Sequence, residues 1–231
     1  NPLPNYILVR EMNAAQENST GAPPKTAPSG GGISRVTIMQ NNVLNYLNKI
    51  VKEKPDKTAY SDGTLSLTFR EVYQQSRSIG SFLHKKGVYK KPVVVFMRKS
   101  PYEVAAFFGI VTGGDFYVPI DEEMPGSRIQ LILDNVKSPV ILCDRDTVEI
   151  AKSFGRQESE IVLYDDIKDT EIDDNALEEI CRRAIDTDPI YIVFTSGSTG
   201  IPKGVAACHR SVIDYIEQLS EILDMLADAA K

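Results

Sequence analysis

The sequence contains only three cysteines and two histidines in 231 residues. Cys143, Cys181 and Cys208 are odd in number and far apart, which excludes a disulfide framework and favours reduced thiols in a cytoplasmic protein. His84 and His209 have no metal-binding spacing to each other or to the cysteines. No metal site is therefore expected among these side chains.

Long apolar runs are also missing, so the sequence predicts no membrane-spanning helix. No basic segment followed by an apolar core opens the chain, and we expect no signal peptide. The formal net charge of −6 disfavours nucleic acid and anionic membranes as partners. With 42% hydrophobic residues, the chain can bury a substantial core as one large or two small domains.

Composition divides the chain into a tail and a regular body. Residues 13–35 are rich in Asn, Ser, Thr, Gly and Pro, so residues 1–35 are predicted to be a disordered or linker segment. The short apolar run Tyr6–Val9 is consistent with the end of a preceding domain. The globular body is expected to span residues 36–231.

Strand and helix patterns alternate along this body. Helices are expected near residues 43–50, 72–83, 100–111, 128–133 and 177–184. Strands are expected at 93–97, 116–118, 140–142, 161–163 and 190–194, with a hairpin formed by 58–60 and 65–69. Apolar strands alternating with helices predict an α/β fold with a mainly parallel sheet flanked by helices.

The segment Thr195–Gly204 is the most distinctive part of the sequence. It contains four hydroxyl side chains, three glycines and Lys203. Glycines allow several backbone N–H groups to face one point, and hydroxyls and a lysine add donors and charge, which suits a polyphosphate. The common nucleotide loop G-x-x-x-x-G-K-[ST] is not matched, because Pro202 replaces the second glycine and Gly204 follows the lysine.

We expect this loop to join strand 190–194 directly to a helix that opens near Ser211, with Ser211 and Asp214 as its cap. Val212, Tyr215, Ile216, Leu219, Leu223 and Leu226 are expected to share the apolar face of that helix. A flexible polar linker is the alternative, and it is disfavoured because linkers rarely join a buried strand to a helix.

The residues Phe194–Val205 match the pattern aromatic-T-S-G-[ST]-T-G-x-P-K-G-V. This segment resembles the phosphate-binding signature of adenylate-forming enzymes, the superfamily of amino-acid adenylation domains, acyl-CoA synthetases and luciferases. Gly109–Asp121 resembles a second family stretch, and its Pro-x-Asp ending is typical of the amino-acid-activating branch. Leu67–Val72 fits the family's early helix-opening motif. Asp121 and Arg128 are interpreted as scaffold residues that pair across a turn.

The resemblance covers residues from about 36 to about 223. It implies the N-terminal portion of an AMP-binding adenylation domain, similar to a non-ribosomal peptide synthetase domain or a D-alanine–carrier-protein ligase. Such enzymes activate an amino-acid carboxylate with ATP and Mg²⁺, release pyrophosphate, and pass the acyl group to the phosphopantetheine arm of a peptidyl carrier protein.

The resemblance also implies the site residues. Lys203 and Thr199 are expected to be catalytic, with Lys203 offsetting phosphate charge. The residues expected to bind the nucleotide are Thr195, Ser196, Gly197, Ser198, Thr199, Gly200, Lys203 and Gly204. His209 falls where the family has a histidine, but a cap or packed side chain is a commoner role for a histidine beside a helix.

The family motifs for adenine, ribose and the C-terminal lysine do not appear before Lys231. The chain is therefore interpreted as an incomplete adenylation domain that is inactive alone. The alternative is a truncated, non-catalytic module that binds a nucleotide or a partner. The reading frame after Lys231 would discriminate between the two.

Overall fold

The computed structural model of the protein describes residues 40–154, 157–195 and 202–229. The predicted linker, residues 1–35, lies outside the described residues. A six-stranded sheet forms the centre of the molecule, in the order β6-β5-β3-β4-β7-β8. Its strands are β3 (Pro92–Phe96), β4 (Phe116–Pro119), β5 (Val140–Cys143), β6 (Glu160–Leu163), β7 (Pro189–Thr195) and β8 (Lys203–Cys208).

All neighbouring strands of this sheet are parallel except β7 and β8, which are antiparallel. A separate antiparallel hairpin pairs β1 (Thr58–Ser61) with β2 (Ser66–Thr68), as the sequence predicted. The helices are α2 (Leu44–Glu53), α3 (Phe69–Lys85), α4 (Pro101–Thr112), α5 (Gly126–Val136), α6 (Val148–Ser153), α7 (Tyr164–Ile167), α8 (Asp174–Arg183) and α9 (His209–Ala229). The predicted α/β fold with a mainly parallel sheet is confirmed.

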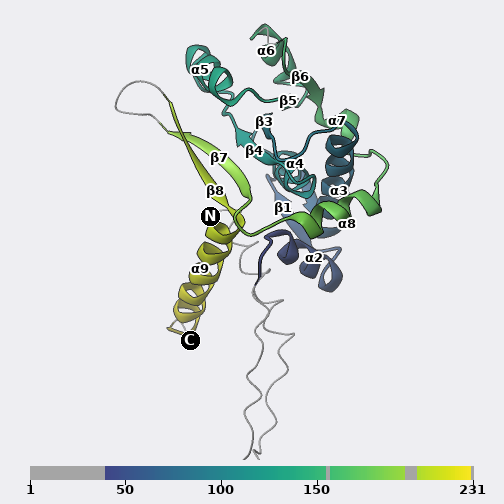
Figure 1. Ribbon diagram of the computed structural model, residues 1–231. Coiled ribbons are helices and arrows are strands. Elements are labelled where there is room, and N and C mark those ends of the chain that lie inside the picture. Colours follow the sequence, from purple (N-terminus) through teal and green to yellow (C-terminus); the bar gives the residue numbers. More distant parts are fainter. Residues whose placement is uncertain (1–39, 155–156, 196–201, 230–231) are drawn as a thin grey trace, which may run out of the picture.

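Helices cover both faces of the sheet, with α2, α3, α4 and α8 on one side and α5 and α6 on the other (Figure 1). Within β3, Val93 and Val95 belong to the core on the α3–α4 side, whereas Val94 and Phe96 belong to the core on the α5–α6 side. Side chains alternate along a strand, so each central strand must be apolar on both faces. This requirement explains the continuous apolar runs in the sequence.

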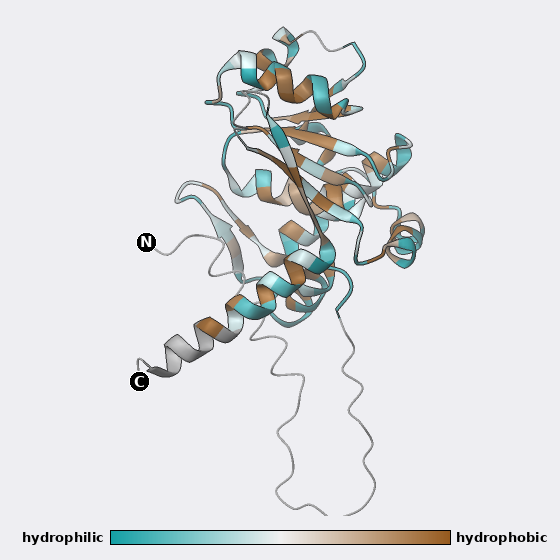
Figure 2. Cartoon of the chain, turned by 60° about the vertical axis from the view of Figure 1, so that its left-hand side comes forward, coloured by the Kyte–Doolittle hydropathy of each residue, from teal (hydrophilic) through white to brown (hydrophobic). Residues whose placement is uncertain are grey.

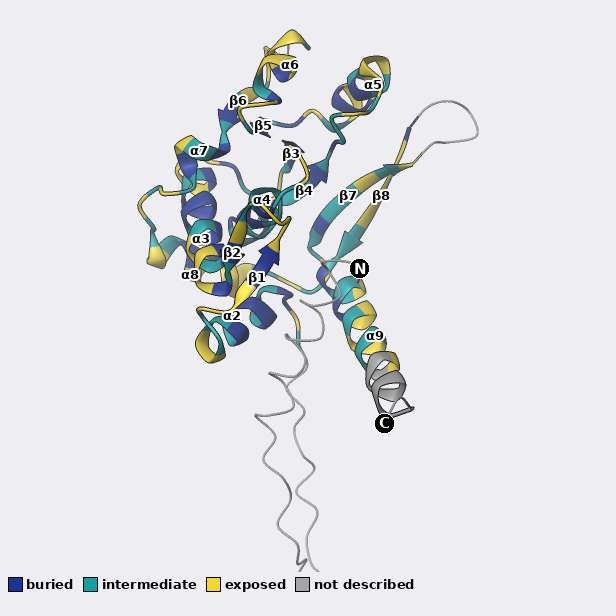
Figure 3. Ribbon diagram, turned by 180° about the vertical axis from the view of Figure 1, so that it is seen from behind, coloured by how far each residue is buried: buried dark blue, intermediate teal, exposed yellow. Residues whose placement is uncertain are grey.

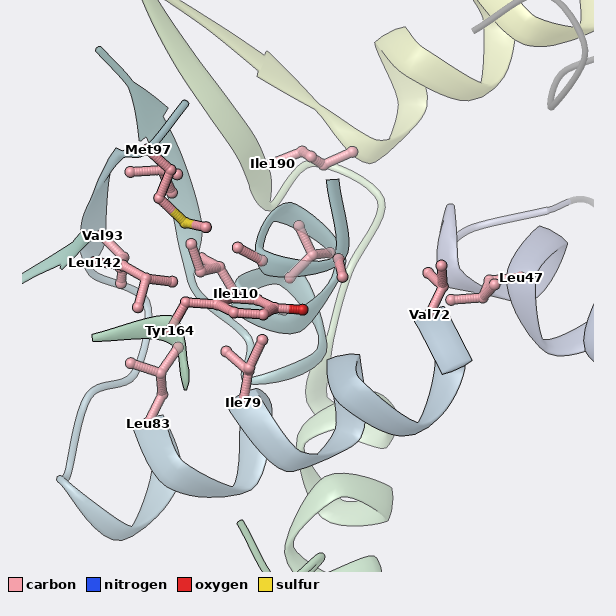
Figure 4. Close-up of a cluster of buried hydrophobic side chains, with 14 of the residues drawn as sticks. Leu47, Val72, Ile79, Leu83, Val93, Met97, Ile110, Leu142, Tyr164 and Ile190 are labelled. Carbon is pink, nitrogen blue, oxygen red and sulfur yellow. The ribbon is translucent and has the colours of Figure 1, made fainter. Parts of the chain in front are cut away.

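The larger core lies between the sheet and α3 and α4. Figure 4 shows Ile79 and Leu83 of α3 and Ile110 of α4 beside Val93 and Leu142 of the sheet. The start of α3 is fixed by a capping box, in which Thr68 and Glu71 exchange side-chain and backbone hydrogen bonds. Figure 2 shows the apolar residues concentrated in the strands at the centre of the body.

Helix α9 follows β8 and runs away from the sheet (Figure 1), and the part of it that Figure 2 colours carries both polar and apolar residues. Along the described part of the chain, no helix has both the length and the apolar character needed to cross a bilayer.

Candidate functional site

The predicted phosphate loop lies at the tip of an antiparallel hairpin formed by β7 and β8. Thr195 ends β7, Lys203 begins β8, and the two residues are paired across the hairpin. The Thr195 hydroxyl donates a hydrogen bond to the Lys203 carbonyl oxygen at 3.4 Å. The structure therefore brings together Thr195, Lys203 and Gly204. The other predicted ligands (Ser196, Gly197, Ser198, Thr199 and Gly200) lie outside the described residues.

The prediction that the loop leads directly into a helix is wrong. The six residues Lys203–Cys208 form β8, and α9 begins at His209. Residues 203–208 form a strand because pairing with β7 satisfies backbone N–H and C=O groups that an irregular connection would leave unpaired.

The two faces of the hairpin differ in their surroundings. Ile192 and Phe194 project to one face and pack against the core on the α5–α6 side. Thr195 and Lys203 occupy positions on the opposite face and are exposed. The Lys203 side chain is exposed, and no hydrogen bond or ion pair links its ammonium to another described residue.

The hairpin tip lies at the edge of the sheet where β3, β4 and β5 also end, because these strands are parallel to β7. In open α/β sheets this edge is where ligands bind. Lys99 follows β3 there, and its ammonium lies 2.8 Å from an Asp121 carboxylate oxygen. The hydrogen bond from Lys99 lowers the pKa of Asp121.

The predicted pairing of Asp121 with Arg128 is therefore wrong, because Asp121 pairs with Lys99. The Arg128 Nε is buried and has no hydrogen-bond partner among the described residues. No sequence pattern pointed to Lys99, because Lys99 and Asp121 come close only when β3 and β4 pair side by side in the sheet.

Glu103, in the first turn of α4, is a titratable group at this edge of the sheet. Its backbone N–H donates to the Ser100 hydroxyl at 3.4 Å, as expected of a cap. Burial of the carboxyl group and the nearby charge of Glu122 raise its pKa to about 7. A carboxyl group that titrates near neutral pH beside a ligand edge is a candidate functional group.

His209 has a structural position rather than a place near the loop. The side chain is 4% exposed, and its Nδ1 accepts a hydrogen bond from the Val43 backbone N–H at 3.2 Å. Burial lowers its pKa, which favours the neutral imidazole that this contact requires. The packed role expected for His209 matches this geometry.

The predicted cap of α9 is also wrong. Ser211 and Asp214 lie inside the helix, and the Ser211 hydroxyl is 3.2 Å from the Cys208 thiol. The expected apolar face is correct for Val212 and Ile216, which pack against the core, but Tyr215 is 65% exposed. Ile213, which was not expected there, is also buried and belongs to the larger core.

Comparison with known proteins agrees with the motifs. A family described as AMP-binding enzyme matches residues 47–228. The D-alanine–D-alanyl carrier protein ligase of Staphylococcus aureus (strain JH9) is 30% identical over 184 residues, which are 78% of this chain and 35% of that protein. The chain thus spans about a third of the length of this curated relative.

Solved structures share the fold at low identity. The non-ribosomal peptide synthetase FmoA3, in its α-methyl-L-serine-AMP bound form, has a TM-score of 0.67 at 21% identity over 92% of this chain and 22% of that one. VinN has a TM-score of 0.61 at 20% identity, covering 74% and 46%. The fatty acyl-adenylate ligase of L. pneumophila, in complex with acyl adenylate and pyrophosphate, has a TM-score of 0.59 at 22% identity, covering 75% and 31%. The chain, with its fold and the matched residues 47–228, belongs to the family of AMP-binding enzymes.

Proposed function

We propose that the protein takes part in ATP-dependent activation of an amino-acid carboxylate, and that this chain supplies the phosphate-binding hairpin. A carboxylate oxygen attacks the α-phosphorus of ATP, the bond from that phosphorus to the bridging oxygen breaks, and pyrophosphate leaves. The thiol of a carrier-protein phosphopantetheine arm then attacks the acyl carbon, and AMP leaves.

The observation that carries this proposal is the hairpin that holds Thr195 and Lys203 on either side of the loop. The Lys203 ammonium would offset the negative charge that gathers on the departing pyrophosphate, and fixed donors aimed at developing charge are an effective form of catalysis. The Thr195 hydroxyl donates to the Lys203 carbonyl oxygen in this structure, and in this proposal it turns from that acceptor to donate to a phosphate oxygen. In this proposal Thr199, within the loop, is the third residue that contacts the phosphates, beside Thr195 and Lys203.

An amino-acid substrate and a carrier-protein partner are supported by the relatives. One of them is a D-alanine–D-alanyl carrier protein ligase, and another was solved with α-methyl-L-serine-AMP. In the described residues no group of three or more His, Cys, Asp or Glu side chains gathers that could hold a metal. Mg²⁺ is therefore proposed to enter as the Mg·ATP complex, with phosphate oxygens among its ligands.

Titration of the chain with Mg·ATP by calorimetry tests the proposal. Lys203→Ala should weaken binding by about ten-fold or more, because a charge-assisted contact is worth about 1.5–3 kcal/mol. Lys91→Ala is the matched control, since Lys91 is exposed and precedes β3 at the opposite edge of the sheet. In the full-length protein, Lys203→Ala should lower amino-acid-dependent ATP–pyrophosphate exchange to a similar extent. Equal binding and exchange in the parent and Lys203→Ala would refute the role of this lysine.

A further inference from the structure

Gly204 occupies a position in the hairpin where an added side chain would meet two neighbouring side chains. It lies directly opposite Phe194 across the two strands. A Cβ atom on Gly204 would lie 2.8 Å from the Ile192 Cγ2 and 3.2 Å from the Phe194 Cζ. A Cβ atom essentially never lies within 3.0 Å of a non-bonded atom, so a side chain here would require Ile192 to shift.

Ile192 and Phe194 are half-buried, and each is held on its inner side by the core. Both pack against the buried cluster that contains Val94, Phe96 and Ile120 on the α5–α6 side of the sheet. Glycine inside a strand is ordinarily unfavourable, and it is typical of places where other atoms approach closely. The reason for glycine at this position is thus the close approach of two anchored side chains.

This contact has a consequence for the register of the hairpin. A slip of one residue would move every side chain of β8 to the other face. Lys203 or Val205 would then lie opposite Phe194, where a Cβ atom would meet the Ile192 and Phe194 side chains at 2.8 and 3.2 Å. Steric crowding at the neighbouring pair therefore favours the register that places Lys203 opposite Thr195.

We propose that Gly204, Ile192 and Phe194 are positioning residues, which fix the face of the sheet on which Lys203 and Thr195 meet the phosphates. Gly204 acts in this way through its lack of a side chain rather than as a phosphate ligand. The inference rests on the proposed function for the ligand, but the register itself is a property of the hairpin without nucleotide.

The test compares Gly204→Ala, Ile192→Ala and the double variant Gly204→Ala/Ile192→Ala. Val205→Ala is the matched control, because Val205 is the next residue of β8 and is 57% exposed on the opposite face. Hydrogen exchange of the β7 and β8 amides is measured without nucleotide, and Mg·ATP affinity by calorimetry. Circular dichroism shows whether each variant is folded.

Gly204→Ala is expected to lose exchange protection in β7 and β8 and to weaken Mg·ATP binding by about ten-fold or more, the loss expected when Lys203 is displaced. The double variant should regain most of the exchange protection and most of the Mg·ATP affinity, since removing the Ile192 Cγ2 makes room for the added methyl group. Val205→Ala should retain both within about two-fold.

Each failure has a separate meaning. Unchanged protection in Gly204→Ala, or no recovery in a folded double variant, would overturn the positioning role. A parent chain that does not bind Mg·ATP, while Gly204→Ala still loses protection and the double variant recovers it, would refute nucleotide binding by this chain and support the register assignment. Lost binding with unchanged protection would make Gly204 a direct ligand contact and would overturn the proposal.

Discussion

At the scale of single residues, Asp115 shows how burial shapes the response to pH. The side chain is 2% exposed, one carboxylate oxygen accepts a hydrogen bond from the Lys91 backbone N–H at 3.0 Å, and the other has no partner among the described residues. Burial raises its pKa from an ordinary value of 3.8 to about 7. The folded chain therefore holds a proton that the unfolded chain releases between these two values.

The stability that Asp115 contributes is fully present below about pH 4 and is lost as pH rises through about 7. Asp115→Asn keeps an oxygen acceptor for the Lys91 N–H and removes the charge. We expect the variant to be more stable than the parent at about pH 8, and the gain to disappear near pH 4, since each pKa unit corresponds to about 1.4 kcal/mol.

Urea unfolding at several pH values checks this expectation. Glu103 also has a pKa raised to about 7, so the pH dependence of the parent's unfolding free energy cannot be assigned to Asp115 alone. The relevant quantity is the difference in unfolding free energy between Asp115→Asn and the parent at each pH. Glu103→Gln serves as the comparison. A difference between Asp115→Asn and the parent that does not change with pH would contradict the assignment.

At the scale of elements, the packing of α3 on α4 depends on two glycines. A Cβ on Gly109 of α4 would lie 2.6 Å from the Ile79 Cβ, and one on Gly80 of α3 would lie 2.9 Å from the Gly113 backbone nitrogen. The two helices therefore approach more closely than side chains would allow. Gly109→Ala should destabilise the chain by about 1–3 kcal/mol, the usual cost of overpacking a core.

Gly126 provides the control for this substitution, because it begins α5 and a Cβ there would meet nothing closer than the Phe154 Cε1 at 3.9 Å. Gly126→Ala should be neutral or stabilise the chain by up to about 1 kcal/mol, as alanine does in helices. Chemical denaturation measures both variants. Equal effects of Gly109→Ala and Gly126→Ala would show that helix propensity, rather than close approach, dominates.

Most elements were predictable because their signals are local. The apolar run at β3 and the capping residues Thr68 and Ser100 act within a few residues of where they stand. Strand β8 was not predictable in the same way. Its residues Lys203–Cys208 are small or exposed, and they become a strand only through pairing with β7. The start of α9 at His209 follows from that pairing.

At the scale of the whole molecule, alternation of strands and helices predicted a parallel sheet but not its strand order. The order β6-β5-β3-β4-β7-β8 depends on which helices cover which face, and no local pattern records this. The same limit applies to the site. Thr195 and Lys203 were predicted together because one loop carries both, whereas Lys99 and Asp121 meet only through tertiary packing.

Strand β8 is the outermost strand on one side of the sheet, and its position predicts how the molecule behaves in solution. In the described structure β8 pairs with β7 alone, so its outer side presents unpaired backbone groups, and Figure 3 shows both strands as largely exposed or half-buried. Val205 on β8 and Val193 on β7 are paired and are 57% and 42% exposed. An exposed apolar edge strand promotes pairing between molecules, and a lysine on such an edge opposes it.

Val205→Lys should therefore lower self-association of the chain in sedimentation velocity at high concentration, without loss of thermal stability. Ile185→Lys is the control, because Ile185 is 55% exposed outside any strand. An equal decrease in both variants would assign the effect to net charge or apolar area rather than to strand pairing at this edge.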